Sequence, residues 1–488
     1  MPRRIVCIAC AVSLLLASAA GRTGYIIFSK NYTVSSGYNS YSLTVSRISQ
    51  TVYDKNKKKL NNNKNTLVAV IKPNEKCLAE LELLFEKNEI RKIKKELEKG
   101  YPVLKQTDVY ADCKYIKLID TVSSDKNQIA DLVAKSYNDT VEEKKINFAV
   151  DAKGRFLDGD NETLSDYVDP NAAAGVIVSV DSRIQKIAEE AAKNMKKGAV
   201  VVMDPSTSEI LALYSAGNDG LNRALMQYSV GSAFKIIVAS CAEEYGITLD
   251  YTCTGKITVG DTEFSCQNEK AHGEQNIKTA LANSCNCYFV KLALTLGADK
   301  LLKTARDFGF GINYSLMKNY DLLSGNLPSD NDLKSSGQLA LFGFGQGKLT
   351  ASPLSFCAAL CAVANGGSFK QPQFILGEID GAGNYLPAQT APQREIISRG
   401  TSKIVLSYMR YVVENGTGRT ADCKKLSAGK TSTAQSGRYE NGTEILNTWF
   451  AGVYPYDNPE YAIVVMTENG KSGAGDCCPI FRAIVEKL

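Results

Sequence analysis

Hydrophobic and polar positions divide the chain into three parts, the first of which is an apolar start. Residues 5–21 form an uncharged, largely apolar run behind Arg3 and Arg4. A run of about 17 residues is at the short limit for crossing a bilayer. Because flanking arginines stay in the cytoplasm, we expect residues 1–24 to anchor the chain in the cell membrane, with the rest on the extracytoplasmic face. The small residues 17–19 keep signal-peptidase cleavage open as an alternative.

The second part, residues 25–171, is polar and rich in lysine and asparagine. Between residues 75 and 99, apolar side chains recur at three- and four-residue steps, which predicts an amphipathic helix that stops at Gly100. Short β-like runs at 67–71 and 115–119 complete a small α+β module. Since this part contains no constellation of catalytic residues, we predict that it is a non-catalytic pedestal domain.

The third part, residues 172–488, has strand-like runs at both ends and helical patterns between them. The strand-like runs are 176–180, 198–204, 210–214, 448–454 and 461–467. The clearest helical patterns are 181–196, 234–241 and 479–488. This order predicts an α+β domain with one mainly antiparallel sheet, whose first and last segments pair, and a helical subdomain inserted between them.

Charge and histidine content narrow the range of functions. The chain of 488 residues has 57 Lys and Arg against 52 Asp and Glu. Its net charge of +5 is far from the dense basic field of nucleic-acid binding, so we expect no nucleic-acid partner. The single histidine, His272, leaves no room for a multi-histidine metal site and makes a Ser-His-Asp triad a poor first hypothesis. We interpret His272 as a structural loop residue.

The 14 cysteines do not form paired C-x2-C knuckles, so we expect neither a metal site nor a cofactor. Cys253 and Cys266 flank a short segment that contains glycine. A disulfide between them and a pair of free thiols both stay open at this point. We interpret most of the other cysteines as small buried hydrophobic residues.

A serine and a lysine at the start of an apolar helical run form the first chemical motif. Ser232 follows Gly231, and Lys235 lies just under one helical turn later, so both side chains share a face. A lysine that is desolvated in a cleft can be neutral and take the proton of a serine, which removes any need for histidine. The same S-x-x-K spacing also occurs at Ser123/Lys126, Ser315/Lys318 and Ser427/Lys430. Only Ser232 has the preceding glycine and the helix start that favour an alkoxide.

Two further motifs follow along the chain. Ser284 and Asn286 place a hydroxyl and an amide two residues apart, and Lys430 and Thr431 lie in an expected strand. A phosphate-binding loop is excluded for the second pair because Walker A needs a glycine at position 424, which is lysine. We interpret Lys430 as a cationic clamp for a carboxylate.

The ordered set S-x-x-K, S-x-N and K-T-x is the signature of penicillin-recognising serine acyltransferases. Over residues 172–488 the chain resembles a class B penicillin-binding protein, of the penicillin-binding protein A type. The supporting stretches include GAVVVMDPSTSEILALYS at 198–215, SCNCYF at 284–289, GFGQGKLTASPLSF at 343–356 and NTWFAGVYPYDNPEYAIVV at 447–465. The 150 residues before the catalytic part leave no room for a glycosyltransferase domain, which argues against class A.

The resemblance implies a role for each residue of the first two motifs. Ser232 corresponds to the acylated nucleophile, and Lys235 corresponds to its base. Ser284 corresponds to the relay that passes a proton to the leaving amine. Asn286 corresponds to the residue that binds the amide of the donor peptide.

The resemblance also implies how the substrate is held. Lys430 and Thr431 would bind the terminal carboxylate, and the backbone amides of Ser232 and Thr433 would form the oxyanion hole. The family's Lys-Thr-Gly reads Lys-Thr-Ser here, with Ser432 in the place of glycine. We expect the side chain of Ser432 to narrow the cleft along the strand edge and to affect the affinity for β-lactams.

The function implied is that of a peptidoglycan D,D-transpeptidase, which cross-links stem peptides through a serine acyl-enzyme and is inhibited covalently by β-lactams. Its partners would be a D-Ala-D-Ala donor, an amine acceptor and a membrane glycan-strand synthase. One alternative is a hydrolase, either a D,D-carboxypeptidase or a β-lactamase. The Glu-x-Leu-Asn at 444–447 follows the Lys-Thr motif, which is the wrong order for a class A β-lactamase. The other alternative is a non-catalytic scaffold of a wall-synthesis complex.

Overall fold

The computed structural model describes residues 2–29, 40–137, 140–151, 154, 156–157, 162–169 and 174–488. They divide between two compact units. The smaller unit contains Met1–Arg47, Leu67–Thr121 and Glu142–Val168, and the larger contains Ile48–Thr66, Val122–Val141 and Asp169–Leu488. The boundary expected at 24/25 falls inside a helix, and the one expected at 171/172 lies outside the described residues.

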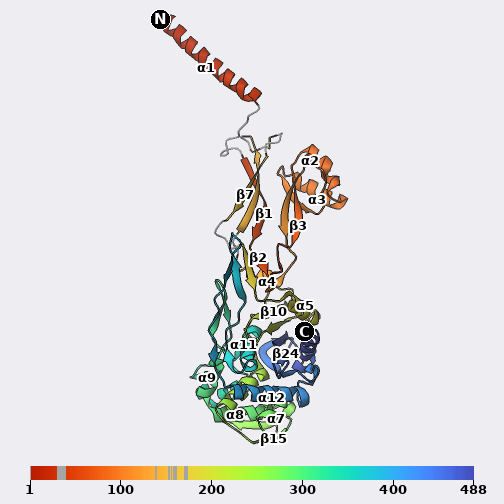
Figure 1. Cartoon of the computed structure of the whole chain (residues 1–488), viewed down its shortest axis with the longest axis vertical. Helices are drawn as coiled ribbons and strands as arrows, with labels where there is room; N and C mark the ends of the chain where they lie inside the picture. The colour runs from red at the N-terminus through yellow and green to blue at the C-terminus, as the bar shows by residue number, and fades with distance from the viewer. Residues whose placement is uncertain are drawn as a thin grey trace. The chain divides into compact units, whose positions relative to one another are not determined.

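The smaller unit begins with the helix α1 (Pro2–Ser29) and contains two sheets (Figure 1). One has the strand order β1 (Ser40–Ser49), β6 (Thr140–Ala149) and β7 (Glu162–Val168), and the other has the order β4 (Val103–Thr107), β3 (Lys64–Ile71) and β5 (Lys117–Ser123). No helix within the described part of the chain combines the length and the apolar character that crossing a membrane requires.

The single helix expected at 75–99 is divided in the structure. It consists of α2 (Glu75–Glu80), a 3-10 turn at Leu81–Leu83, and α3 (Lys87–Leu97). Glu86 has extended backbone, with ψ 156°, and changes the direction of the chain between the two helices. This change lets the apolar residues of both helices reach one core, where the expected periodic side chains Leu81, Ile93 and Leu97 are buried.

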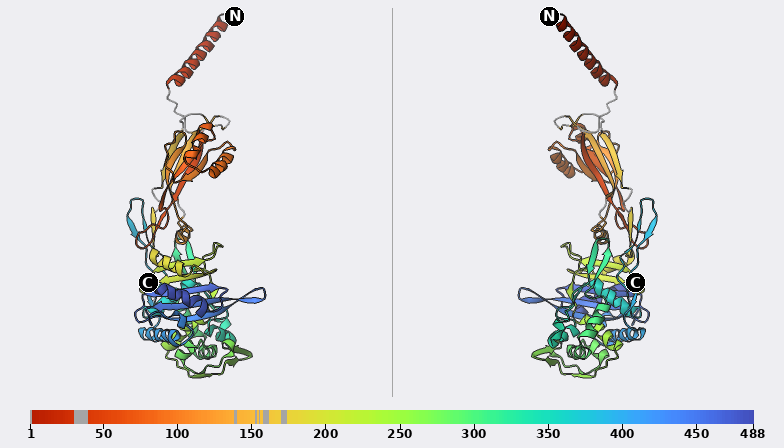
Figure 2. Two further views of the ribbon diagram at one scale, coloured as in Figure 1. Left: turned by 90° about the vertical axis from the view of Figure 1, so that its right-hand side faces the viewer. Right: turned by 90° about the vertical axis from the view of Figure 1, so that its left-hand side faces the viewer.

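The larger unit is built on a five-stranded sheet in the order β10-β9-β25-β24-β23. Its strands are β9 (Gly198–Met203), β10 (Ile210–Ala216), β23 (Ala428–Glu440), β24 (Thr443–Tyr454) and β25 (Tyr461–Glu468). Every neighbouring pair is antiparallel, and β9 pairs with β25, so the first and last strands meet as expected. The predicted α+β fold with an antiparallel sheet is therefore confirmed. The tip of the β23–β24 hairpin, drawn in blue, extends from the body of this unit (Figure 2).

Both faces of this sheet are buried, which explains its continuous apolar runs. Side chains alternate between the faces of a strand. Phe450 and Ile463 belong to a core with α5 (Ser182–Ala191) and α13 (Cys478–Val485), whereas Trp449 and Val464 belong to a core with α11 (Pro353–Ala364).

The helical subdomain lies between the early and late strands in sequence. Its helices are α6 (Lys235–Glu244), α7 (Ile277–Ala282), α8 (Asn286–Leu296), α9 (Ala298–Asp307), α10 (Ser336–Gly343) and α12 (Arg399–Asn415). Helix α6 is enclosed by its neighbours, because all residues from Lys235 to Ala242 are buried. Figure 1 shows α7, α8 and α12 together at one end of the unit. Two small two-stranded sheets complete this region. In the first, β12 (Tyr251–Cys253) pairs with β15 (Gly273–Gln275), and in the second, β13 (Lys256–Val259) pairs with β14 (Thr262–Ser265).

A second, smaller sheet of the larger unit has the order β2-β8-β20-β21. Its strands are β2 (Thr51–Tyr53), β8 (Gly175–Val178), β20 (Ile375–Ile379) and β21 (Tyr385–Pro387). Strand β2 pairs in parallel with β8, so part of the chain before residue 66 belongs to the larger unit.

Candidate active site

A tight turn that only glycine can form places Ser232 at the start of α6. Gly231 has φ +61°, and a Cβ added to it would lie 2.6 Å from Ser432 Oγ and 2.8 Å from Ala434 Cβ. Its amide donates to the carbonyl of Gly345 over 2.9 Å, which fixes the turn from the other side. Ser232 follows in a short 3-10 helix and is half-buried against the edge strand β23.

Lys235 joins the first two sequence motifs. Its Nζ donates to Asn286 Oδ1 over 2.7 Å, to the carbonyl of Ser284 over 2.9 Å and to Ser284 Oγ over 3.4 Å. The side chain is fully buried, and this burial lowers the pKa of Lys235 to about 8. A substantial fraction of the lysine is therefore neutral near physiological pH, as a general base requires.

Backbone strain and helix α8 position the second motif. Ser284 has φ +54°, a conformation that non-glycine residues adopt rarely. Cys285 caps α8, and its Sγ accepts the amide of Tyr288 over 3.4 Å. The amide nitrogen of Asn286 donates to the carbonyl of Ser265 over 2.9 Å, so this side chain connects Lys235 to the loop after β14.

The third motif lies on the edge strand β23, where Lys430 is fully buried. Its Nζ donates to the carbonyl of Thr431 over 2.8 Å. Burial, and next the charge of Lys235, hold the pKa of Lys430 well below its usual range. The hydroxyls of Thr431 and Thr417 are 2.5 Å apart, and the hydroxyl of Thr433 accepts the amide of Gly473 over 3.4 Å.

The three motifs meet at one cleft of about 730 Å³. The expected site residues that line it are Ser232, Ser284, Asn286, Thr431 and Thr433. Lys235 and Lys430 are fully buried, and their Nζ atoms are connected to the cleft by hydrogen bonds to the lining residues Ser284, Asn286 and Thr431.

Ser432 lines the cleft, and the expectation that its side chain narrows the cleft stays a prediction. Its residue is 2% exposed, and its hydroxyl donates to the carbonyl of Val230 over 2.7 Å. The side chain therefore ties strand β23 to the segment before the nucleophile. This contact also depends on the glycine at 231, because a Cβ there would collide with Ser432 Oγ.

Some features of the cleft were not expected from the sequence. Thr417 lines it and contacts Thr431, although nothing in the residues around it resembles a motif. His272 also lines the cleft, and its Nδ1 lies 3.6 Å from Cys253 Sγ. The sulfur atoms of Cys253 and Cys266 are 3.7 Å apart, so the two thiols are free and the disulfide alternative is not realised.

Comparison with known proteins gives the relatives of this arrangement. The family described as the penicillin binding protein transpeptidase domain matches residues 198–486. Stage V sporulation protein D of Bacillus subtilis is 30% identical over 369 residues, which cover 69% of this chain and 56% of that protein. The peptidoglycan D,D-transpeptidase MrdA of Acinetobacter baumannii is 29% identical, over 62% of this chain and 52% of that protein. The chain thus spans about half the length of these curated relatives.

Solved structures show the same fold. Penicillin-binding protein A from Mycobacterium tuberculosis, a ceftriaxone acyl-enzyme complex, is 24% identical with a TM-score of 0.58, over 66% of this chain and 81% of that one. Penicillin-binding protein 3 from the same organism is 21% identical with a TM-score of 0.64, over 91% and 96%. The family match covers more than half of the chain and confirms the resemblance seen in the sequence. This chain belongs to the penicillin-binding protein transpeptidase family.

Proposed function

We propose that this protein is a peptidoglycan D,D-transpeptidase that cross-links stem peptides through an acyl-enzyme on Ser232. The observation that carries the proposal is the buried Lys235, three residues after Ser232, with Ser284 and Asn286 within hydrogen-bond distance of its Nζ. A base with a pKa of about 8, three residues after a half-buried serine on the same helix start, is suited to acyl transfer without histidine.

In the proposed first step, Ser232 Oγ attacks the carbonyl carbon of the penultimate D-Ala while neutral Lys235 takes the hydroxyl proton. The peptide C–N bond then breaks, and a proton passes through Ser284 to the amine of the departing D-Ala. In the second step an acceptor amine attacks the ester, its proton is removed by the same groups, and Ser232 recovers its hydroxyl proton. The backbone amides of Ser232 and Thr433 stabilise the oxyanion in both steps.

The lining of the cleft supports a donor with a terminal carboxylate. The cationic residues Lys270 and Arg419 line it, and Thr431 presents its hydroxyl from the strand in which Lys430 is buried. In this proposal Lys430 and Thr431 hold the carboxylate and Asn286 holds the donor amide. β-Lactams carry an equivalent carboxylate, so they enter the same site.

The same lining favours a transpeptidase over a hydrolase. No aspartate or glutamate is among the described residues that line the cleft, so no carboxylate stands ready to activate water. Glu444, the glutamate of the Glu-x-Leu-Asn sequence, accepts hydrogen bonds from the side chain of Gln435 and the amide of Gly437 on the β23–β24 hairpin. The acyl-enzyme formed with a β-lactam is therefore expected to be long-lived.

Turnover of a chromogenic cephalosporin by the full chain in detergent tests this proposal. We expect a burst of about one equivalent followed by slow release, and no burst from Ser232→Ala. Rapid multiple turnover would favour the hydrolase. Absence of a burst from the folded wild-type protein would favour the non-catalytic scaffold.

We further propose that residues 1–24 anchor the protein in the cell membrane and that 25–171 act as a pedestal for the catalytic part, 172–488. Arg3, Arg4 and the uncharged run at 5–21 support the anchor. A membrane glycan-strand synthase is then the proposed partner, because it would supply nascent strands at the same surface. External protease should digest a tag placed after residue 488 on cells whose wall has been removed, and a soluble mature chain starting near Ala20 would indicate cleavage instead.

A further inference from the structure

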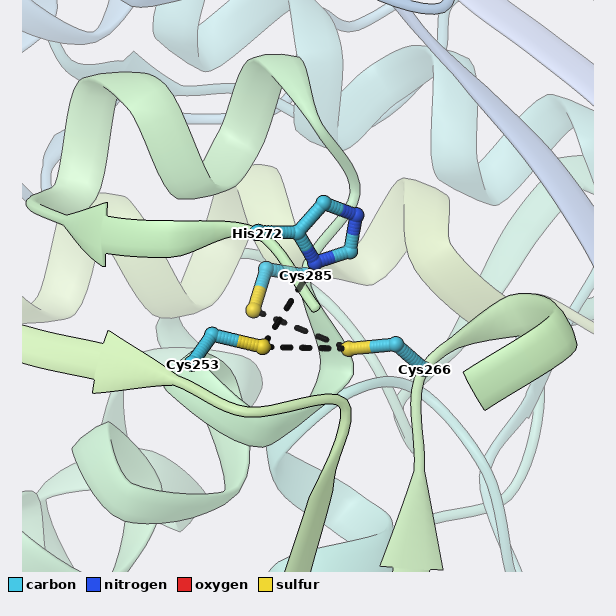
Figure 3. A group of neighbouring side chains, drawn as sticks. All are labelled: Cys253, Cys266, His272 and Cys285. Carbon is cyan, nitrogen blue, oxygen red and sulfur yellow. Dashed lines mark hydrogen bonds between the residues drawn. The ribbon is translucent and has the colours of Figure 1, made fainter. Parts of the chain in front are cut away.

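Three cysteines and the single histidine converge on one point (Figure 3), and two of these residues, Cys266 and His272, line the cleft. Cys253 ends strand β12, Cys266 precedes a 3-10 turn at Gln267–Glu269, His272 precedes β15, and Cys285 caps α8. Their side chains point toward one another, and the four ligand atoms all lie within 4.8 Å of one another. The three cysteines are at most 2% exposed.

Three distances between these atoms match the edges of a tetrahedral metal site. Zinc binds thiolate sulfur at about 2.3 Å and imidazole nitrogen at about 2.05 Å, which places two sulfurs about 3.8 Å apart and a sulfur and a nitrogen about 3.6 Å apart. The Sγ atom of Cys266 lies 3.7 Å from the Sγ atoms of Cys253 and Cys285, and Cys253 Sγ lies 3.6 Å from His272 Nδ1. A disulfide would instead need sulfurs at about 2.05 Å.

We propose that Cys253, Cys266, Cys285 and the Nδ1 atom of His272 bind one zinc ion. Three thiolates and one imidazole are a donor set that zinc prefers, and the site reverses the expectation of no metal. The amide of Tyr288 donates to Cys285 Sγ and supports this ligand from the first turn of α8. Cys287 is a fourth thiol, 3.5 Å from Cys266 Sγ, and lies outside the four-atom group.

The ion has a structural role in this proposal. Four protein ligands complete a tetrahedral shell and leave no open position for water or substrate. The ligands come from four separate segments over 33 residues, and the β13–β14 hairpin lies between Cys253 and Cys266. Binding therefore fastens this hairpin and the adjoining loops to the start of α8.

The site also bears on the S-x-N motif, because Cys285 is the residue between Ser284 and Asn286. A metal bond to Cys285 would hold the strained backbone of Ser284, and a bond to Cys266 would hold the neighbouring Ser265, whose carbonyl accepts from Asn286. Both effects keep the partners of Lys235 in place. This consequence rests on the proposed function, whereas metal binding itself does not.

Metal content of the full-length protein, purified without chelator from cells grown with zinc, tests the site directly. We expect about one zinc per chain by elemental analysis, and Co²⁺ added to the apo-protein should give the visible bands of a tetrahedral ion with sulfur-to-metal charge transfer. A protein free of zinc that also gives no such Co²⁺ spectrum would overturn the proposal. So would an intact mass that has lost two hydrogens through a disulfide within the cluster.

Variants separate these ligands from other thiols. Because Cys287 can replace one lost ligand, the test variant is the double change Cys253→Ser and Cys266→Ser, which should lose both the zinc and the Co²⁺ spectrum. Cys287→Ser and the distant, buried Cys361→Ser are matched controls and should retain one zinc. Retention of the metal by the double variant would refute the assignment, and the wild-type Co²⁺ spectrum decides the matter if that variant does not fold.

Removal of zinc by a strong chelator gives the readout for the structural role. We expect a lower midpoint of thermal unfolding, restored by Zn²⁺ but not by Mg²⁺, and slower acylation by a fluorescent penicillin. An unchanged midpoint after confirmed loss of zinc would contradict the structural role. If zinc is present and its loss lowers the midpoint while no penicillin ever reacts, the metal site stands and the proposed function fails.

Discussion

The rate of acylation should follow the neutral fraction of Lys235 as the pH changes. Burial lowers the pKa of this lysine from 10.5 to about 8, so only the minor, neutral part can accept the proton of Ser232 at lower pH. With that pKa, the neutral fraction rises about tenfold between about pH 7 and about pH 9 and then levels off. The carboxylate of a penicillin does not titrate in this range, so the profile belongs to the protein.

Replacement of Lys235 by arginine removes the neutral form altogether, because a guanidinium keeps its charge throughout this range. Acylation by a fluorescent penicillin should fall by about 10²-fold or more, and the rise with pH should disappear. Lys291→Arg, an exposed exchange on α8, is the control and should keep both the rate and the profile. Rates are read from labelled bands quenched at intervals over the pH series.

Two results would refute this reasoning. A flat profile for the wild type would mean that Lys235 does not limit acylation through its protonation. A near-normal rate in Lys235→Arg with the same rise toward high pH would assign the base to another group.

Two further changes test contacts around the site. Ser432→Gly removes the hydrogen bond to the carbonyl of Val230, which is worth about 1 kcal/mol. Because this bond ties β23 to the segment before the nucleophile, acylation should slow about fivefold, equally in Ser432→Ala. Faster acylation in the glycine variant would show instead that the side chain crowds the cleft. Arg223→Met leaves Glu468, whose side chain is 11% exposed, without its buried cationic partner and should reduce the free energy of unfolding by about 3 kcal/mol in urea titrations. The exposed Arg482→Met should change the free energy of unfolding far less, and equal effects of the two arginine changes would contradict this account.

The sheet of the larger unit was predictable because its strands are buried on both faces. The runs 199–203 and 462–466 are apolar at every position. Their pairing was expected because helical patterns fill the chain between the early and the late strands. The order of Ser232, Ser284 and Lys430 likewise predicted which segments meet. The break in the helix expected at 75–99 was not predictable from periodicity, since both halves keep the same apolar spacing and differ only in direction at Glu86.

The side-chain details of the site depend on tertiary contacts that no local pattern contains. Lys430 is buried, and Ser432 turns toward Val230, because strand β23 lies against the turn at Gly231. The cysteine cluster has no C-x2-C spacing, and its atoms approach only when β12 pairs with β15 and α8 begins beside them. The sequence signal was the joint presence of Cys253, Cys266, His272 and Cys285 shortly before and within the S-x-N motif. Rules based on C-x2-C spacing do not detect a metal site of this kind.

The central claim is that Ser232 is the acylated nucleophile. Its most direct test is mass spectrometry of peptides from the full-length protein after reaction with benzylpenicillin. We expect one penicilloyl adduct, on the peptide that contains Ser232, and none in Ser232→Ala, whose thermal unfolding should match that of the wild type. An adduct on Ser123, Ser315 or Ser427, the serines of the other S-x-x-K sequences, would contradict the account.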